Sequence, residues 1–162
     1  MRDERRGLDH PSRALIADIC SEHKTVLECG CATAIDYPLH IERGTKYTGI
    51  DITPKLIELA KELNPGIDAR EASILELPFE FESFDTVYER AVFEHMHYLE
   101  WPLALQEMWR VASSQVIIAC FGWSKKRYHK KSILERMKTE EVKNGPTGPF
   151  TNAICHPDII FT

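Results

Sequence analysis

Apolar and polar residues alternate along the chain in two distinct patterns. Short apolar runs, typical of strands, occupy residues 25–29, 46–51, 84–89 and 115–121, with a weaker run at 67–73. Segments whose apolar residues recur every three or four positions, typical of helices, cover residues 10–22, 35–42, 53–64 and 101–112. The chain therefore predicts a regular succession of strands and helices.

This succession predicts an α/β fold, a three-layer Rossmann-like sandwich with a mostly parallel central sheet and helices on both faces. The run QVIIACF (115–121) is continuously apolar, as expected of a strand buried on both faces. The chain ends on another apolar run, HPDIIFT (156–162), where a sheet of this class usually continues. We therefore expect the last strands of the sheet to be missing.

The length of 162 residues suits one domain with a single core. We assign residues 1–162 to that domain, with an N-terminal helical region at 1–22 and a variable C-terminal part at 122–162. The C-terminal part contains the basic run SKKRYHKK (124–131), which we interpret as a solvated helix face rather than a nucleic-acid site. A helix is expected over 125–142.

The composition bears on the class of protein, its partners and its location in the cell. Hydrophobic residues make up 43% and charged residues 28%, as in ordinary globular proteins. The net charge of −5 argues against a nucleic-acid surface, and no apolar run approaches the ~20 residues of a membrane span. The charged N-terminus, MRDERRGLDH, has no apolar secretory core. We expect a cytoplasmic protein without membrane or nucleic-acid partners.

The five cysteines fit reduced thiols in that compartment. Cys29 and Cys31 are two positions apart, but no second pair stands at zinc spacing. We therefore predict no metal site and interpret these cysteines as small buried residues.

Candidate chemistry begins at TVLECGCATAID (25–36), where a strand, a turn and a helix follow one another. Such a turn places backbone N–H groups and the positive end of a helix at the carboxyl edge of the sheet, where α/β folds bind ligands. Gly30 permits an unusual backbone conformation or the close approach of a ligand. A plain strand–helix connection explains these residues equally well.

Asp51 follows the second strand, about twenty residues past Gly30. An acid at this distance accepts hydrogen bonds from the hydroxyls of a ribose. Asp51 could instead cap the next helix, but Thr53 is the better cap, which leaves Asp51 for a ligand. The second and third glycines of the dinucleotide pattern are absent from residues 30–35, and Ala32 would push a pyrophosphate away, so a nucleoside without phosphates fits the turn better.

Between Thr25 and Phe121 the chain resembles the class I S-adenosylmethionine-dependent methyltransferases, in their small-molecule branch. The similar segments, in the order of that family, are VLECGCATA (26–34), YTGIDITPKLIELAKE (47–62), EASILELPFEFESFDTVYERAVFEHM (71–96) and ALQEMWRVASSQVIIAC (104–120). The resemblance implies methyl transfer from S-adenosylmethionine to a small-molecule acceptor. The chain departs from the family at Ala32 and Ala34, where the family has glycines.

The resemblance also implies roles for individual residues. Glu28 would face the amino group of the cofactor, directly or through water, beside Gly30 and Cys31 in the turn. Asp51 would bind the ribose. The other expected cofactor residues are Ile52 beside the adenine, Ser73 in place of the usual Asp, Ile74 through its N–H, and Glu89 just past the fourth strand.

His95 is the candidate general base, because histidine titrates near neutrality and the pair Glu94–His95 matches the family. A structural role for His95 competes with this interpretation. Tyr98, Trp101 and Trp123 are candidates for lining an acceptor pocket.

Three functions stay open at this point. The first is a methyltransferase; the second is a non-catalytic domain of the same fold that serves as a cofactor-binding or partner subunit; the third is a nicotinamide-dependent oxidoreductase. A homodimer is also open.

Overall fold

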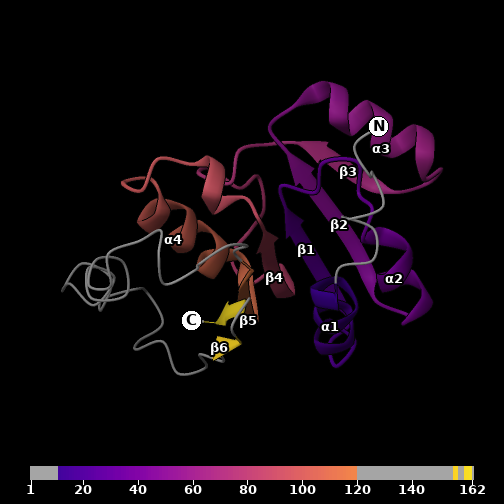
Figure 1. Cartoon of the computed structure of the whole chain (residues 1–162), viewed down its shortest axis with the longest axis horizontal. Helices are drawn as coiled ribbons and strands as arrows, with labels where there is room; N and C mark the ends of the chain where they lie inside the picture. Colours follow the sequence, from indigo (N-terminus) through magenta and orange to yellow (C-terminus); the bar gives the residue numbers. More distant parts are fainter. Residues whose placement is uncertain (1–10, 120–154, 157–158, 162) are drawn as a thin grey trace.

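The computed structural model of the chain describes residues 11–119, 155–156 and 159–161 (Figure 1). Expectations for the segment 120–154, including a helix at 125–142 and a role for Trp123, lie outside these residues. The helices are α1 (Pro11–Cys20), α2 (Tyr37–Glu42), α3 (Pro54–Leu63), the 3₁₀ helix η2 (Phe93–His95) and α4 (Trp101–Val111). The strands are β1 (Thr25–Cys29), β2 (Lys46–Asp51), β3 (Asp68–Glu71), β4 (Phe84–Arg90), β5 (Ala112–Ala119), β6 (Cys155–His156) and β7 (Ile159–Phe161).

These strands form one sheet in the order β3-β2-β1-β4-β5-β7-β6. The pairs among β1 to β5 are all parallel, and the helices α1 to α4 lie against them (Figure 1). This arrangement confirms the predicted α/β fold with a mostly parallel sheet.

The expectation of missing last strands was wrong. The apolar run near the end of the chain supplies β7, which pairs antiparallel with β5 through Ile118 and Ile160. β6 pairs antiparallel with β7 in turn. Both strands are short, but they cover the edge that β5 would otherwise expose.

Alternating residues of the strands enter two separate cores. In β1, Val26 lies in the core that contains residues of α1 and α3, whereas Leu27 and Cys29 lie in the core that contains α4. In β4, Tyr88 belongs to the first core and Val87 to the second. The alternation is the two-residue period of a strand buried on both faces, and it decides on which side each polar residue of the sheet lies.

The order 3-2-1-4 places the carboxyl ends of four parallel strands side by side. Because the chain leaves β1 and β4 for opposite layers, the loops after these two neighbouring strands diverge, which is where ligands bind in open α/β sheets. The candidate site follows from this topology.

Candidate functional site

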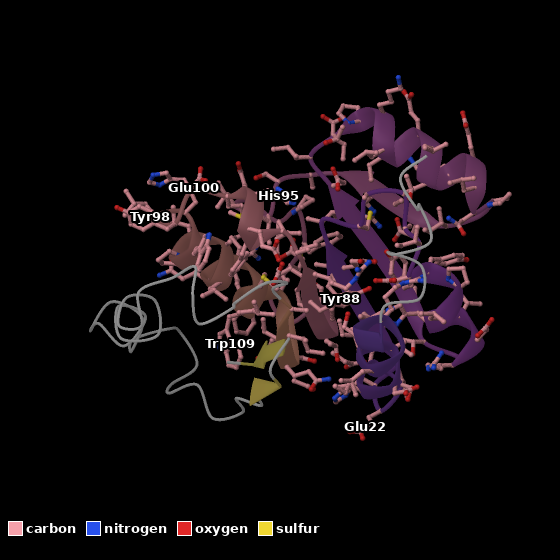
Figure 2. All side chains as sticks on the ribbon, in the orientation of Figure 1. Glu22, Tyr88, His95, Tyr98, Glu100 and Trp109 are labelled. Carbon is pink, nitrogen blue, oxygen red and sulfur yellow. The ribbon has the colours of Figure 1, made fainter. Side chains whose placement is uncertain are left out.

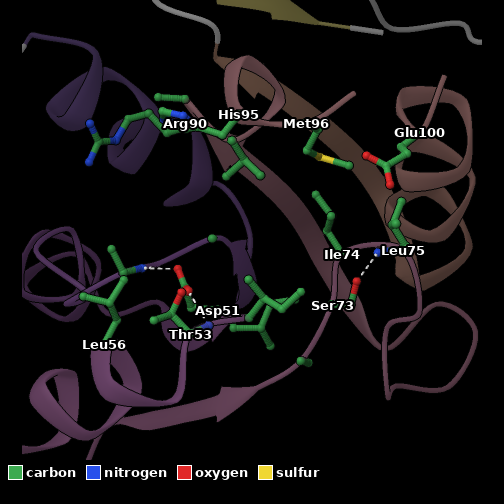
Figure 3. A pocket seen from close by; sticks show the side chains of 17 residues that line it. Asp51, Thr53, Leu56, Ser73, Ile74, Leu75, Arg90, His95, Met96 and Glu100 are labelled. Atoms are coloured by element: carbon green, nitrogen blue, oxygen red, sulfur yellow. Dashed lines mark hydrogen bonds between the residues drawn. The ribbon is translucent and has the colours of Figure 1, made fainter. Parts of the chain in front are cut away.

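A cavity of about 580 Å³ opens at the carboxyl ends of the first four strands (Figure 3). Its walls come from four connections, those that follow β1, β2, β3 and β4. The lining residues are Gly30, Ala32, Ile50, Asp51, Ile52, Thr53, Leu56, Ala72, Ser73, Ile74, Leu75, Arg90, Ala91, Val92, His95, Met96 and Glu100. Six of the nine residues predicted for the site therefore lie together in it.

The loop after β1 turns sharply because Gly30 adopts a φ of +74°. A Cβ at this position would lie 2.2 Å from Cγ2 of Val92, so only glycine lets the loop pass the wall formed after β4. The N–H groups of Gly30 and Cys31 both donate to the carbonyl of Ile50, at 2.7 and 2.8 Å. These bonds fix the loop to the end of β2.

Ala32 and Ala34 both have a left-handed backbone. Their φ angles are +49° and +54°, in the left-handed region where a Cβ costs about 1–2 kcal/mol per residue. Ala32 lines the cavity, while Ala34 is fully buried in the core beside α1. The turn therefore has left-handed backbone at positions 30, 32 and 34, with a methyl group at the last two.

Asp51 is the carboxylate that joins two of the loops. One carboxylate oxygen accepts from the N–H of Ala32 at 3.0 Å, and the other accepts from the N–H of Thr53 at 2.8 Å. Thr53 is the N-cap residue of α3, as predicted, but its side chain makes no capping hydrogen bond. A carboxylate has about four acceptor positions, so each oxygen can still receive a ligand hydroxyl.

The wall after β3 is held from outside the cavity. Ser73 Oγ accepts from the N–H of Leu75 at 3.1 Å, which fixes the turn at 73–75. Behind that turn, Glu107 of α4 accepts from the N–H of Leu77 at 2.8 Å, and Arg110 donates to the carbonyls of Leu77 and Phe79 at 2.8 and 2.7 Å.

The sequence analysis missed this support, although an acid and an arginine three positions apart on a helix are a recognisable pair. Glu107 and Arg110 bind each other at 2.7 Å as well as binding the loop.

The connection between β4 and α4 forms the remaining wall. His95 lies at the end of η2 with an exposed side chain, and Tyr98 and Glu100 of the same connection lie farther along it (Figure 2). Tyr98 and Trp101, expected near an acceptor, do not line the cavity. The Tyr98 ring contacts His97, and Trp101 stacks on the buried ring of Phe93 at 5.4 Å.

Glu28, Cys31 and Glu89 do not line the cavity either. Glu28 is 3% exposed and accepts a hydrogen bond from the hydroxyl of Tyr47. Burial, together with the charge of Asp36, raises the pKa of Glu28 to about 8. The Cys31 thiol is buried, and a Cβ on Gly49 would lie 2.8 Å from its sulfur, so glycine in β2 makes room for it.

Glu89 lies within β4 rather than past it, and its side chain is fully buried. Its carboxylate accepts from the N–H groups of Val92, Phe93 and Ala119, at 2.8, 3.4 and 3.0 Å. Burial raises its pKa to about 7. Glu89 therefore ties the start of the β4–α4 connection to the end of β5.

On the α1–α2 side of the loop lies a group that we call the buried polar cluster: Arg13, Glu28, Asp36, His40, Tyr47, Tyr88 and Arg90. Asp36 pairs with Arg13 through one oxygen and with Arg90 at 2.9 Å through the other. His40 hydrogen-bonds the hydroxyl of Tyr88 at 3.1 Å, and burial lowers the pKa of His40 to about 4.

Two absences hold for the part of the chain that the structure describes. No group of three or more His, Cys, Asp and Glu side chains is placed to hold a metal ion. No helix in that part is long and apolar enough to cross a membrane. Cys20, Cys29 and Cys31 are buried free thiols.

Residues 27–120 match the protein family described as "Methyltransferase domain". No curated protein sequence matches the chain significantly. Among solved structures, similar folds include CalS10 of Micromonospora echinaspora, bound to S-adenosylmethionine and described as an amino pentose methyltransferase. Its identity is 18% and its TM-score 0.65, over 75% of this chain and 54% of that one.

Two other structures give the same picture. KedS8 of Streptoalloteichus, a sugar N-methyltransferase, has 17% identity and a TM-score of 0.65, over 78% of this chain and 54% of its own. PH0226 of Pyrococcus horikoshii has 18% identity and a TM-score of 0.64, over 93% of this chain and 69% of its own. The chain spans about half the length of the first two proteins, CalS10 and KedS8.

Proposed function

The chain belongs to the methyltransferase domain family, and we propose that it transfers the methyl group of S-adenosylmethionine to a small-molecule acceptor. The observation that carries this proposal is the position of Asp51. Its carboxylate lies at the end of β2, lines the cavity, and is held by N–H groups of the two loops on either side. A carboxylate held in this way suits the two hydroxyls of a ribose.

The cavity then has a part for the ribose at Asp51 and a further part on each side of it. On one side, Gly30 and Ala32 border the space for the amino-acid tail of the cofactor. On the other side, Ile52 offers an apolar contact to the adenine and Ile74 offers its N–H, with Ser73 at the edge of the ring. Ile52 is 70% exposed, and a bound base would cover it.

We assign supporting roles to three predicted residues that lie behind the cavity. Glu28 supports the loop after β1 through its hydrogen bond with Tyr47. Cys31 supports the same loop by packing its sulfur against Gly49 of β2. Glu89 holds the loop after β4 by binding three N–H groups. Their effect on the cofactor is through the position of these loops.

The cofactor supplies a methyl group bound to a positively charged sulfur, and transfer is a direct displacement. The protein therefore has mainly to align the acceptor with the carbon–sulfur bond and to keep water away. His95 lines the cavity from the β4–α4 connection, so its imidazole is placed to take a proton from an acceptor that must lose one. Our assignment of His95 as general base rests on this position.

The neighbouring connections suggest where the acceptor enters. The segment after β4 leads to Tyr98, Leu99 and Leu103, which are exposed and do not line the cavity. CalS10 and KedS8 act on sugars that carry an amino group, and we propose a small molecule of comparable size for this chain. A cytoplasmic location and a homodimer stay predictions.

The two alternative functions have less support. A nicotinamide dinucleotide needs room for a pyrophosphate at the turn after β1, where the methyl group of Ala32 lies. A non-catalytic domain would not need His95 at the cavity, although it would bind the cofactor equally well.

Calorimetric titration of the purified protein tests the proposal. We expect S-adenosylmethionine and S-adenosylhomocysteine to bind with one site per chain and to raise the melting temperature, and NAD to do neither. Absence of binding by both sulfur compounds would refute the methyltransferase function. Binding without turnover of any offered acceptor, in wild type and His95→Ala alike, would favour the non-catalytic domain.

A further inference from the structure

Ser73 lines the end of the cavity that we assign to the adenine. The resemblance to the methyltransferase family implies an Asp at this position, as acceptor for the adenine amino group. The Oγ of Ser73 already accepts from the N–H of Leu75, so it faces a base mainly as a hydroxyl donor. A hydroxyl donor suits a ring nitrogen of adenine and leaves the amino group without an anionic acceptor.

A second carboxylate lies at this end of the cavity. Only Asp51 and Glu100 contribute carboxylates to the described lining. Figure 3 shows Glu100 on the same side of the cavity as Ser73 and Leu75, with Asp51 and Thr53 on the other side. If Asp51 holds the ribose, Glu100 faces the base.

The local backbone holds Glu100 in place. Its N–H donates to the carbonyl of His97 at 2.9 Å, and its carboxylate accepts from the N–H of His97 at 3.1 Å. These two bonds close a turn directly before α4, whose first residue is Trp101. The ion pairs found among the described residues do not include Glu100, so its charge is available to a ligand.

We infer that Glu100 accepts a hydrogen bond from the amino group of the adenine, in place of the Asp absent at position 73. This inference rests on the proposed function, because it needs the nucleoside to lie across Asp51. A carboxylate only accepts hydrogen bonds, so it favours an amino group and disfavours a carbonyl at the same ring position. Glu100 thereby makes the protein selective for adenosine over inosine compounds.

The test compares S-adenosylhomocysteine with its 6-oxo analogue, in which a carbonyl replaces the amino group. We expect wild type to bind the amino compound at least ~tenfold more tightly, the scale of a hydrogen bond to a charged group. Glu100→Gln should bring the two affinities within ~threefold, because an amide can donate to the carbonyl. Ser73→Asp in the Glu100→Gln background should restore the preference.

Matched variants separate this role from general damage. Glu76→Gln removes an exposed carboxylate in the connection after β3, outside the cavity, and should keep the wild-type ratio. Glu100→Asp keeps the negative charge but shortens the side chain, and it should also lower the ratio of the two affinities.

The results distinguish two failures. If wild type binds neither compound, the proposed function itself fails. If wild type binds and prefers the amino compound, but Glu100→Gln keeps that preference or Ser73→Ala abolishes it, the assignment of Glu100 is overturned. Equal binding of both compounds by wild type would overturn it as well.

Discussion

The cavity and the buried polar cluster lie on two sides of the loop after β1, and their carboxylates have different partners. In the cavity, Asp51 receives two backbone N–H groups and keeps acceptor positions open. In the cluster, Asp36 is 2% exposed and lies between two arginines, while Glu28 is buried with Tyr47. Asp51 is buried too, at 9% exposed, so the difference lies in the partners. Carboxylates with side-chain partners inside the fold stabilise it, whereas a carboxylate with spare acceptor positions at a cavity suits a ligand.

This comparison predicts that substitutions in the two regions change different measured quantities. Changes in the cluster should alter the free energy of unfolding, and changes in the cavity should alter ligand affinity. The variants below are ordered by the size of the expected effect.

Asp36→Asn should have the largest effect, a loss of about 3 kcal/mol in the free energy of unfolding. The change leaves the buried guanidinium of Arg13 and the partly buried guanidinium of Arg90 facing a neutral amide. Urea denaturation measures it. The control is Asp18→Asn, whose exposed pair with Arg43 should contribute less than ~1 kcal/mol. Equal losses in both variants would mean that the Asp36 pairs do not stabilise the fold.

Glu28→Gln should make stability less dependent on pH. The folded-state pKa of Glu28 is raised to about 8, so the folded state holds a proton that the unfolded chain has released. Stability from this group is present at low pH and falls as pH rises through 8. Between pH 6 and 8 the wild type should lose on the order of 2 kcal/mol relative to Glu28→Gln.

Denaturation at several pH values checks this prediction, with Glu62→Gln on the exposed face of α3 as the control. Parallel pH profiles of wild type and Glu28→Gln would show that Glu28 ionises normally inside the fold.

Asp51→Ala should weaken binding of S-adenosylhomocysteine by at least ~1.5 kcal/mol, the scale of lost hydrogen bonds to a charged group. Calorimetry measures the affinity. Asp68→Ala removes a carboxylate on β3 that binds Thr48 and Arg70 outside the cavity, and it should leave the affinity unchanged. An unaltered affinity in Asp51→Ala would refute the ribose assignment.

Ala32→Gly should stabilise the fold by about 1 kcal/mol, because it relieves the strain of a left-handed alanine. Ala34→Gly relieves the same strain but loses a fully buried methyl group, worth about 0.8 kcal/mol, so it should be nearly neutral. Thermal melting of the two variants tests this difference. Destabilisation by both would mean that the loop does not follow the left-handed path.

The sequence was sufficient to predict what local pattern determines. Strand and helix order followed from apolar periodicity, and the place of Gly30 and Asp51 at neighbouring strand ends followed from parallel topology. The same alternation places Glu28 two residues after Val26, and so on the α1–α2 face beneath the loop. That face could have been assigned from the sequence.

Other features depend on contacts between distant segments and could not be predicted in this way. The pairing of β7 with β5 joins strands separated by about forty residues, Ile118 with Ile160. The hydrogen bond from the N–H of Ala32 to Asp51 joins the loop after β1 to the end of β2. Glu100 lines the same cavity as residues after β2 and β3, and this grouping exists only in the folded chain.

A crystal structure of the protein with S-adenosylhomocysteine tests the central claim most directly. We predict both ribose hydroxyls within hydrogen-bond distance of the Asp51 carboxylate, with the amino-acid tail beside Gly30 and Ala32. A nucleoside bound elsewhere, or an Asp51 carboxylate that contacts only the backbone in the complex, would contradict the account.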